Sequence, residues 1–123
     1  MNEATEKLSD LDDANAAWGA MKLRPERTGL PMAVWITPND GYPHDARVKV
    51  SKLYGGGGSW TRDAVQVGVR PQPREIVPNS LTAGDFALVR RWIELNRDLI
   101  VDVWNGTVDA IAEEVYPRLQ KLP

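Results

Sequence analysis

The stretch LTAGDFALVRRWIELNRDLIVDVWNG, from Leu81 to Gly106, has the clearest periodicity in the chain. Thr82 followed three residues later by Asp85 is typical of a capping box, and Gly106 stands where a helix would stop. At 100° per residue, the apolar side chains occupy one half of the helical wheel and the charged ones the other half. The pattern predicts an amphipathic helix over 82–105 that covers a sheet.

The segments before this helix are β-branched and are separated by turn residues, which is typical of strands. They are MAVWIT at 32–37, DARVKVSKLY at 45–54, AVQVGVR at 64–70 and a short edge segment at 74–77. Alternation in the middle two puts valines on one face and polar or charged side chains on the other. We therefore expect an α+β fold: a small antiparallel sheet of three or four strands packed on a long C-terminal helix, with its other face in water. A short last helix is expected from 107 to about 116.

The N-terminal segment is expected to stand apart from this domain. Residues 1–24 combine an acidic arm with an amphipathic helix over about 4–21, and two prolines and a glycine then lead into a compact α+β domain at 25–123. Leu11, Trp18 and Met21 lie on the apolar side of the expected helix. With Trp60, they are candidate anchors for a protein partner or for a second copy of the chain.

Composition excludes several kinds of chemistry. The chain of 123 residues has no cysteine, which excludes thiolate nucleophiles and sulfur-ligated metals. It has one histidine, which leaves no further histidine for a histidine-based triad or a multi-histidine metal site. We predict no catalytic residues, no metal and no cofactor. The net charge is −2, no apolar run is long enough to cross a membrane, and the N-terminus does not resemble a secretory signal. These features favour a cytoplasmic protein without membrane contact.

Four consecutive glycines occupy 55–58, followed by Ser59 and Trp60. A P-loop would need a lysine directly after its last glycine, because that lysine reaches the phosphates of the nucleotide. The lysine is missing, and alternating segments lie on both sides of the run, so we interpret it as the tip of a hairpin. GGGGS is also the commonest engineered linker unit, and the sequence leaves open whether the run is natural.

Three polar residues form a candidate pocket: His44, Asp45 and Asn96. His44 follows a proline turn, where a histidine often fixes the turn, and Asp45 or Asp40 would orient it in a chemical role. Asn96 lies within the apolar half of the helix, so its amide must find partners. Either it ties the helix to a strand or turn backbone, or it lines a pocket shared with His44.

Arg47, Lys49 and Arg70 form a candidate basic face on the outward side of the sheet, with Lys52 and Arg62 as further candidates. Such a row could meet phosphates. Lysine and arginine on open sheet faces also serve solubility, and the middle two strands place no aromatic residue outward for base stacking. We therefore favour a solvated face.

Two segments resemble a known group of proteins. PHDARVKV, with Pro43 and His44, and RRWIELNRDLIVDVWNG, with Trp92 and Trp104, resemble small uncharacterised bacterial proteins classed as a domain of unknown function and sometimes encoded beside toxin-antitoxin-like genes. The likeness covers roughly residues 27–106. Many of those proteins have histidine at the position of Asn96, and no catalytic motif comes with the resemblance.

Two classes of function remain open. The first is a small non-enzymatic protein-interaction or regulatory module, antitoxin-like or from a mobile element. The second is a nucleic-acid-contacting regulator or small nuclease that uses the basic sheet face.

Overall fold

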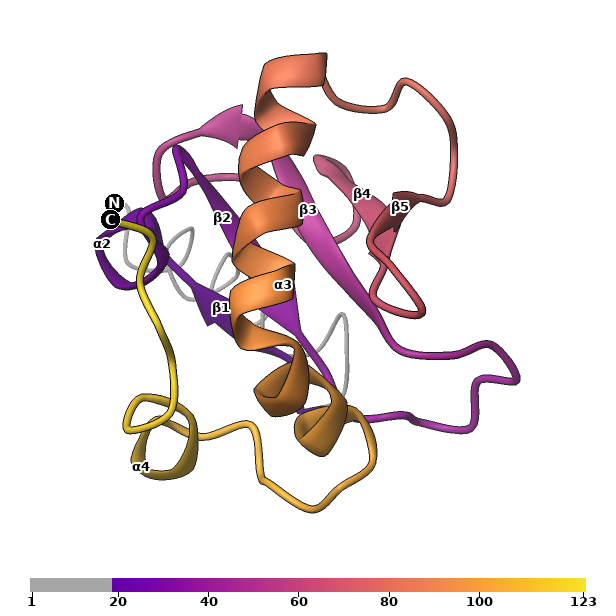
Figure 1. The fold of residues 1–123 in the computed structure, drawn as a ribbon, viewed down its shortest axis with the longest axis vertical. Coiled ribbons are helices and arrows are strands. Elements are labelled where there is room, and N and C mark those ends of the chain that lie inside the picture. Colours follow the sequence, from indigo (N-terminus) through magenta and orange to yellow (C-terminus); the bar gives the residue numbers. More distant parts are fainter. Residues whose placement is uncertain (1–18) are drawn as a thin grey trace, which may run out of the picture.

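An antiparallel sheet of five strands packs against one long helix in the computed structural model, which describes residues 19–123 (Figure 1). The strands follow one another in the sheet in chain order, so each pairs with its neighbour in sequence. The elements are β1 (Met21–Leu23), α2 (Pro25–Thr28), β2 (Met32–Ile36), β3 (Arg47–Tyr54), β4 (Ala64–Gly68), β5 (Arg74–Glu75), α3 (Ala83–Trp104) and α4 (Ala112–Val115).

The α+β class and all four strands expected from the sequence are confirmed, but the sheet has five strands rather than three or four. The additional strand is β1, where we expected the end of a helix. Met21 pairs with Ile36 and Leu23 pairs with Val34. A strand of three residues is too short to show alternation, so its pairing partner decides its conformation. The rest of the expected N-terminal helix, including Leu11 and Trp18, lies outside the described residues.

The long helix begins and ends as its sequence predicts. The Thr82 hydroxyl accepts a hydrogen bond from the Asp85 backbone N–H at 3.1 Å, and Gly106 has a φ of 79° just beyond the last turn. The Tyr54 hydroxyl donates to both carboxylate oxygens of Asp85, at 2.8 and 3.0 Å, which joins the end of β3 to the first turn of α3. The helix is not at the C-terminus, because α4 and a tail follow it.

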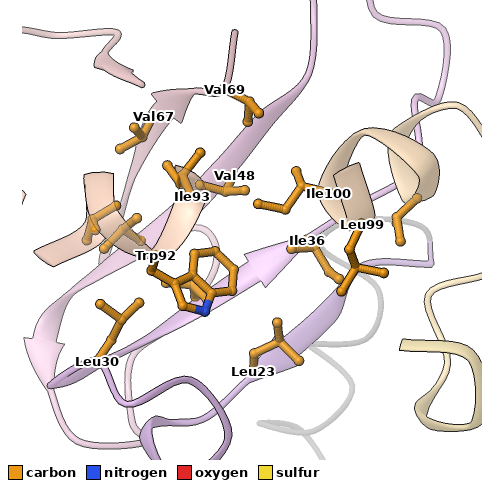
Figure 2. Packing of buried hydrophobic residues seen from close by; sticks show 14 of the residues in the cluster. Leu23, Leu30, Ile36, Val48, Val67, Val69, Trp92, Ile93, Leu99 and Ile100 are labelled. Carbon is orange, nitrogen blue, oxygen red and sulfur yellow. The ribbon is translucent and has the colours of Figure 1, made fainter. Parts of the chain in front are cut away.

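One side of α3 buries its apolar residues against the sheet (Figure 2). Trp92 is fully buried and lies in the middle of this core. The two middle segments contribute valines that alternation assigns to the inner face, so that part of the prediction is confirmed: Val48, Val50, Val67 and Val69 are buried in the core, and Val65 packs against it. β2 adds Val34 to the same core. Burial of this apolar surface is the main source of stability of such a fold.

The C-terminal tail packs beside α2 and adds one residue to the core. It follows α4, which is shorter than the expected helix over 107–116. The Leu122 backbone N–H donates to the Thr28 carbonyl at 2.8 Å, and the C-terminus lies beside α2 (Figure 1). Leu122 belongs to the core.

The glycine run connects β3 to β4, as expected for a hairpin, and it folds back over the sheet. Gly58 has a φ of +96°, and a Cβ there would overlap the Oγ of the buried Ser51. Lys22 Nζ donates to the Gly58 carbonyl at 3.2 Å, and Arg24 Nη1 donates to the Gly56 carbonyl at 2.9 Å. The run is therefore a defined part of the structure and not a flexible spacer.

Replacing Gly58 with alanine should destabilise the fold by about 1–3 kcal/mol, because the backbone is left-handed and the new methyl group meets Ser51. Gly57→Ala is the matched control, since no atom lies within 4 Å of where its Cβ would stand. Urea unfolding of both variants measures the difference. Equal stability of the two variants would contradict the defined conformation of the run.

Candidate functional site

The face of the sheet that points away from α3 carries a row of paired side chains. In the register of the sheet, Lys22 lies opposite Trp35, Trp35 opposite Lys49, and Lys49 opposite Gln66. Because neighbouring residues of a strand point to opposite faces, the burial of Val34, Val48 and Val67 under α3 turns this row outward. β1 to β4 thus each contribute one side chain to it.

Two tryptophans pack together on this face. Trp35 is fully buried, and Trp60 from the β3–β4 connection is 8% exposed. Their ring centroids lie 6.1 Å apart at an interplanar angle of 86°. Lys22 Nζ lies 5.4 Å from the centroid of Trp35, and Lys49 Nζ lies 4.1 Å from that of Trp60, so both amines make cation–π contacts.

These contacts correct two expectations. The outward face is not free of aromatic rings, since Trp35 from β2 and Trp60 lie on it. Trp60 is also not an exposed anchor, because it is buried against Trp35. The alternation of β3 and β4 alone could not show this, because one ring comes from a neighbouring strand and the other from a connection.

A cavity of about 170 Å³ lies beside this row. Its wall includes the loop after β2, which the last turn of α3 holds in place. The Asn39 backbone N–H donates to the Trp104 carbonyl at 2.9 Å, and the Asn39 side chain accepts from the Tyr42 N–H at 2.7 Å. The lining residues are Thr37, Tyr42, His44, Arg47, Lys49, Trp60, Gln66 and Trp104.

Three aromatic rings form one wall of the cavity. The rings of Tyr42 and His44 stack with centroids 5.0 Å apart, and Trp104 lies 6.2 Å from Tyr42 and 5.5 Å from His44. Nδ1 of His44 lies 2.9 Å from the carbonyl oxygen of Asp45, which fixes the ring. Trp104 is buried, whereas Tyr42 is 45% exposed.

Two cations of the same face line the cavity. Arg47 Nη1 donates to Gln66 Oε1 at 3.0 Å, and Lys49 Nζ donates to the Trp60 carbonyl at 3.2 Å. Burial lowers the pKa of the Lys49 amine, because desolvation disfavours its charged form. A bound anion would raise this pKa, because it would favour the charged form of the amine.

A second hollow, of about 460 Å³, shares Lys49 and Gln66 with the first. It extends toward the segment after β5, and its lining residues are Lys49, Lys52, Ala64, Val65, Gln66, Ile76, Val77, Asn79 and Ser80. We call the two hollows together the basic groove. Among the described residues that line it, Arg47, Lys49 and Lys52 are cationic and none is a carboxylate.

Arg70 does not join Arg47 and Lys49. It lines neither hollow of the basic groove, and it forms a two-bond ion pair with Asp45, with Nε and Nη2 donating to the carboxylate at 2.8 and 2.7 Å. Of the candidate basic face, Arg47 and Lys49 line the basic groove, where Lys52 joins them, and Arg70 does not. The Asp45 carboxylate binds Arg70 instead of orienting His44, and this hydrogen bonding lowers its pKa to about 2.

Asn96 has a structural role. Its Nδ2 donates to the Gln120 carbonyl at 2.9 Å and to the Trp92 carbonyl at 3.0 Å, and its Oδ1 accepts from the Gln120 N–H at 2.8 Å. It lines a separate hollow of about 530 Å³ between α3 and the C-terminal tail. The structure thus supports the interpretation that Asn96 ties the helix to a backbone segment, and it does not place Asn96 in a pocket with His44.

Sequence reasoning missed Tyr42, Gln66 and Trp104 as members of the site. Tyr42 stands in a turn segment, and Trp104 falls in the regular pattern of a helix, so neither position shows a local signal. Their proximity to His44 depends on the packing of the loop against the end of α3.

Comparisons with protein-family models, curated proteins and solved structures find no match for this chain. Within residues 19–123, no helix is long and apolar enough to cross a membrane. The same residues contain no cluster of three or more histidine or carboxylate side chains that could hold a metal ion.

The ion pair between Asp45 and Arg70 predicts that the stability of the fold depends on pH in the acidic range. The pKa of Asp45 is lowered on folding, so its stabilisation is present above about pH 4 and is lost as the pH falls toward about 2. The pair is partly exposed, so we expect only about 0.5–1 kcal/mol. The stability difference between wild type and Asp45→Asn, measured by urea unfolding, should shrink over this range. A constant difference would contradict the pairing.

Loss of the Asn96 amide should destabilise the protein. In Asn96→Ala, both the N–H and the carbonyl of Gln120 lose their partner, which we expect to cost about 1–3 kcal/mol. Asn105→Ala, at an exposed position after the helix, is the control. Thermal unfolding compares them, and an Asn96→Ala variant as stable as this control would refute the structural role.

Proposed function

We propose that the chain is a small non-enzymatic binding module of a regulatory system, and that it binds an anionic ligand in the basic groove. The observation that carries the proposal is the set of side chains lining the groove. Three cations and several aromatic rings converge there, with no carboxylate among the described lining residues. A concave surface of one charge sign raises the local concentration of ligands of the opposite sign.

The state of Lys49 supports this proposal. Its amine is half-buried and contacts the carbonyl oxygen and the ring face of Trp60, neither of which carries a negative charge. Arg47 is likewise bonded to the neutral amide of Gln66. In contrast, Arg70, Arg90 and Arg118 each pair with a carboxylate. Arg47 and Lys49 are thus held in place without being neutralised by these contacts.

Binding without catalysis agrees with the composition, because the whole chain has one histidine and no cysteine. The regulatory setting, antitoxin-like or within a mobile element, rests on the resemblance of PHDARVKV and RRWIELNRDLIVDVWNG. Partner anchoring by Leu11 and Trp18 stays a hypothesis about residues outside the described part, and Met21 belongs to β1.

Titration with inorganic polyphosphate tests the proposal by calorimetry at about 50 mM salt, where binding of anions to cationic surfaces is strong. We expect Lys49→Gln to weaken binding about five- to tenfold, which corresponds to about 1–1.4 kcal/mol. Arg90→Gln removes an equal charge from α3, where Arg90 lies 3.6 Å from Glu94, and should leave binding nearly unchanged. Equal effects of the two variants would contradict a specific groove.

A further inference from the structure

We infer that the ligand of the basic groove is single-stranded nucleic acid, with phosphates on Arg47, Lys49 and Lys52 and one base stacked on Tyr42. This inference rests on the proposed function and specifies its ligand. The length of the groove, the position of its aromatic rings and the donors that its cations retain all favour this ligand.

The groove is longer than one anionic group. Its two hollows share Lys49 and Gln66, so the surface continues from the Tyr42 loop across β3 and β4 to the segment after β5. Neighbouring strands lie about 4.8 Å apart, which makes the distance from β3 to β5 about 10 Å. A single phosphate or carboxylate would occupy one hollow, whereas a chain with repeated charges would occupy both.

The aromatic wall distinguishes among chain-like anions. Tyr42 lies nearly parallel to both His44 and Trp104, with interplanar angles of 18° and 19°, and it is the exposed member of the group. A base that stacks on the exposed part of Tyr42 would extend this aromatic group, next to the guanidinium of Arg47 in the same cavity. An acidic peptide would pair with the cations but would leave the ring surface unused.

The polar residues of the groove suit phosphates and base edges. A guanidinium has five N–H donors, and the contact of Arg47 with Gln66 uses one Nη, so the fork retains donors for a phosphate. Gln66, Asn79 and Ser80 add neutral hydrogen-bonding groups beside the apolar Ile76 and Val77. A single strand can turn its bases toward such groups, whereas a duplex keeps them paired.

The test is fluorescence anisotropy with labelled single strands of about 12 nucleotides, within the usual size range of such sites. Duplex of the same length, polyphosphate and polyglutamate serve as competitors. We expect the single strand to bind most tightly. Tyr42→Ala should weaken binding of the single strand at least fivefold and leave binding of polyphosphate unchanged, because only a base uses the ring. Tyr42→Phe should retain the affinity of the wild type.

Lys49→Gln should reduce the slope of log affinity against log salt by about 0.7, the value for one phosphate contact with a single strand. Arg90→Gln, on α3, should leave the slope unchanged. Urea unfolding of each variant checks its fold, and Tyr42→Leu provides a second removal of the ring if Tyr42→Ala does not fold.

The outcomes separate the inference from the proposed function. Equal affinity for polyphosphate and the single strand, with no specific effect of Tyr42→Ala or Tyr42→Leu, would overturn the inference and leave an anion-binding module. Preference for polyglutamate or for duplex would also overturn it. If none of these polyanions binds at about 50 mM salt, the proposed function fails as well.

Discussion

Burial of the apolar side of α3 against the sheet is the interaction on which the other features of this structure depend. It determines which side chain of each strand points inward, because alternate residues of a strand occupy opposite faces. Once Val34, Val48 and Val67 lie under Trp92 and its neighbours, Trp35, Lys49 and Gln66 must point to the other face. A shift of one residue in any strand would exchange the core side chains with those of the groove. The same packing therefore specifies both the core and the candidate binding surface.

Two connections between strands add aromatic side chains to the candidate binding surface. The β3–β4 connection folds over the outward face and brings Trp60 onto Trp35, while the loop after β2 brings Tyr42 and His44 to the end of α3. Hydrogen bonds hold each connection at its base, from Lys22 to the glycine run and from Asn39 to Trp104. The groove thus depends on long-range contacts between segments that are separated in sequence, and its rings and cations are positioned by a rigid scaffold.

Much of the fold could be predicted from the sequence, because its signals are local. The capping box at Thr82 and the alternation around Val48 each act over a few residues, and both predict the observed elements. β1 could not be predicted, since its three residues form a strand only through pairing with β2. The candidate site was predicted in part: Arg47, Lys49 and His44 line it, whereas Arg70 pairs with Asp45 and Asn96 binds the C-terminal tail. These differences arise from tertiary contacts that no periodicity encodes.

The glycine run has a defined structure, although its sequence is typical of a flexible linker. Its residues are chemically identical but occupy different environments: Gly58 is packed against Ser51, Gly56 lies close to the Arg24 side chain, and the position of a Cβ at Gly57 is unobstructed. A boundary search that treats GGGGS as a spacer would divide the chain between β3 and β4, which are hydrogen-bonded neighbours. Fragments cut at this point would separate Lys49 from Gln66 and would each expose half of a shared core. The run should therefore be kept intact in any dissection of the protein.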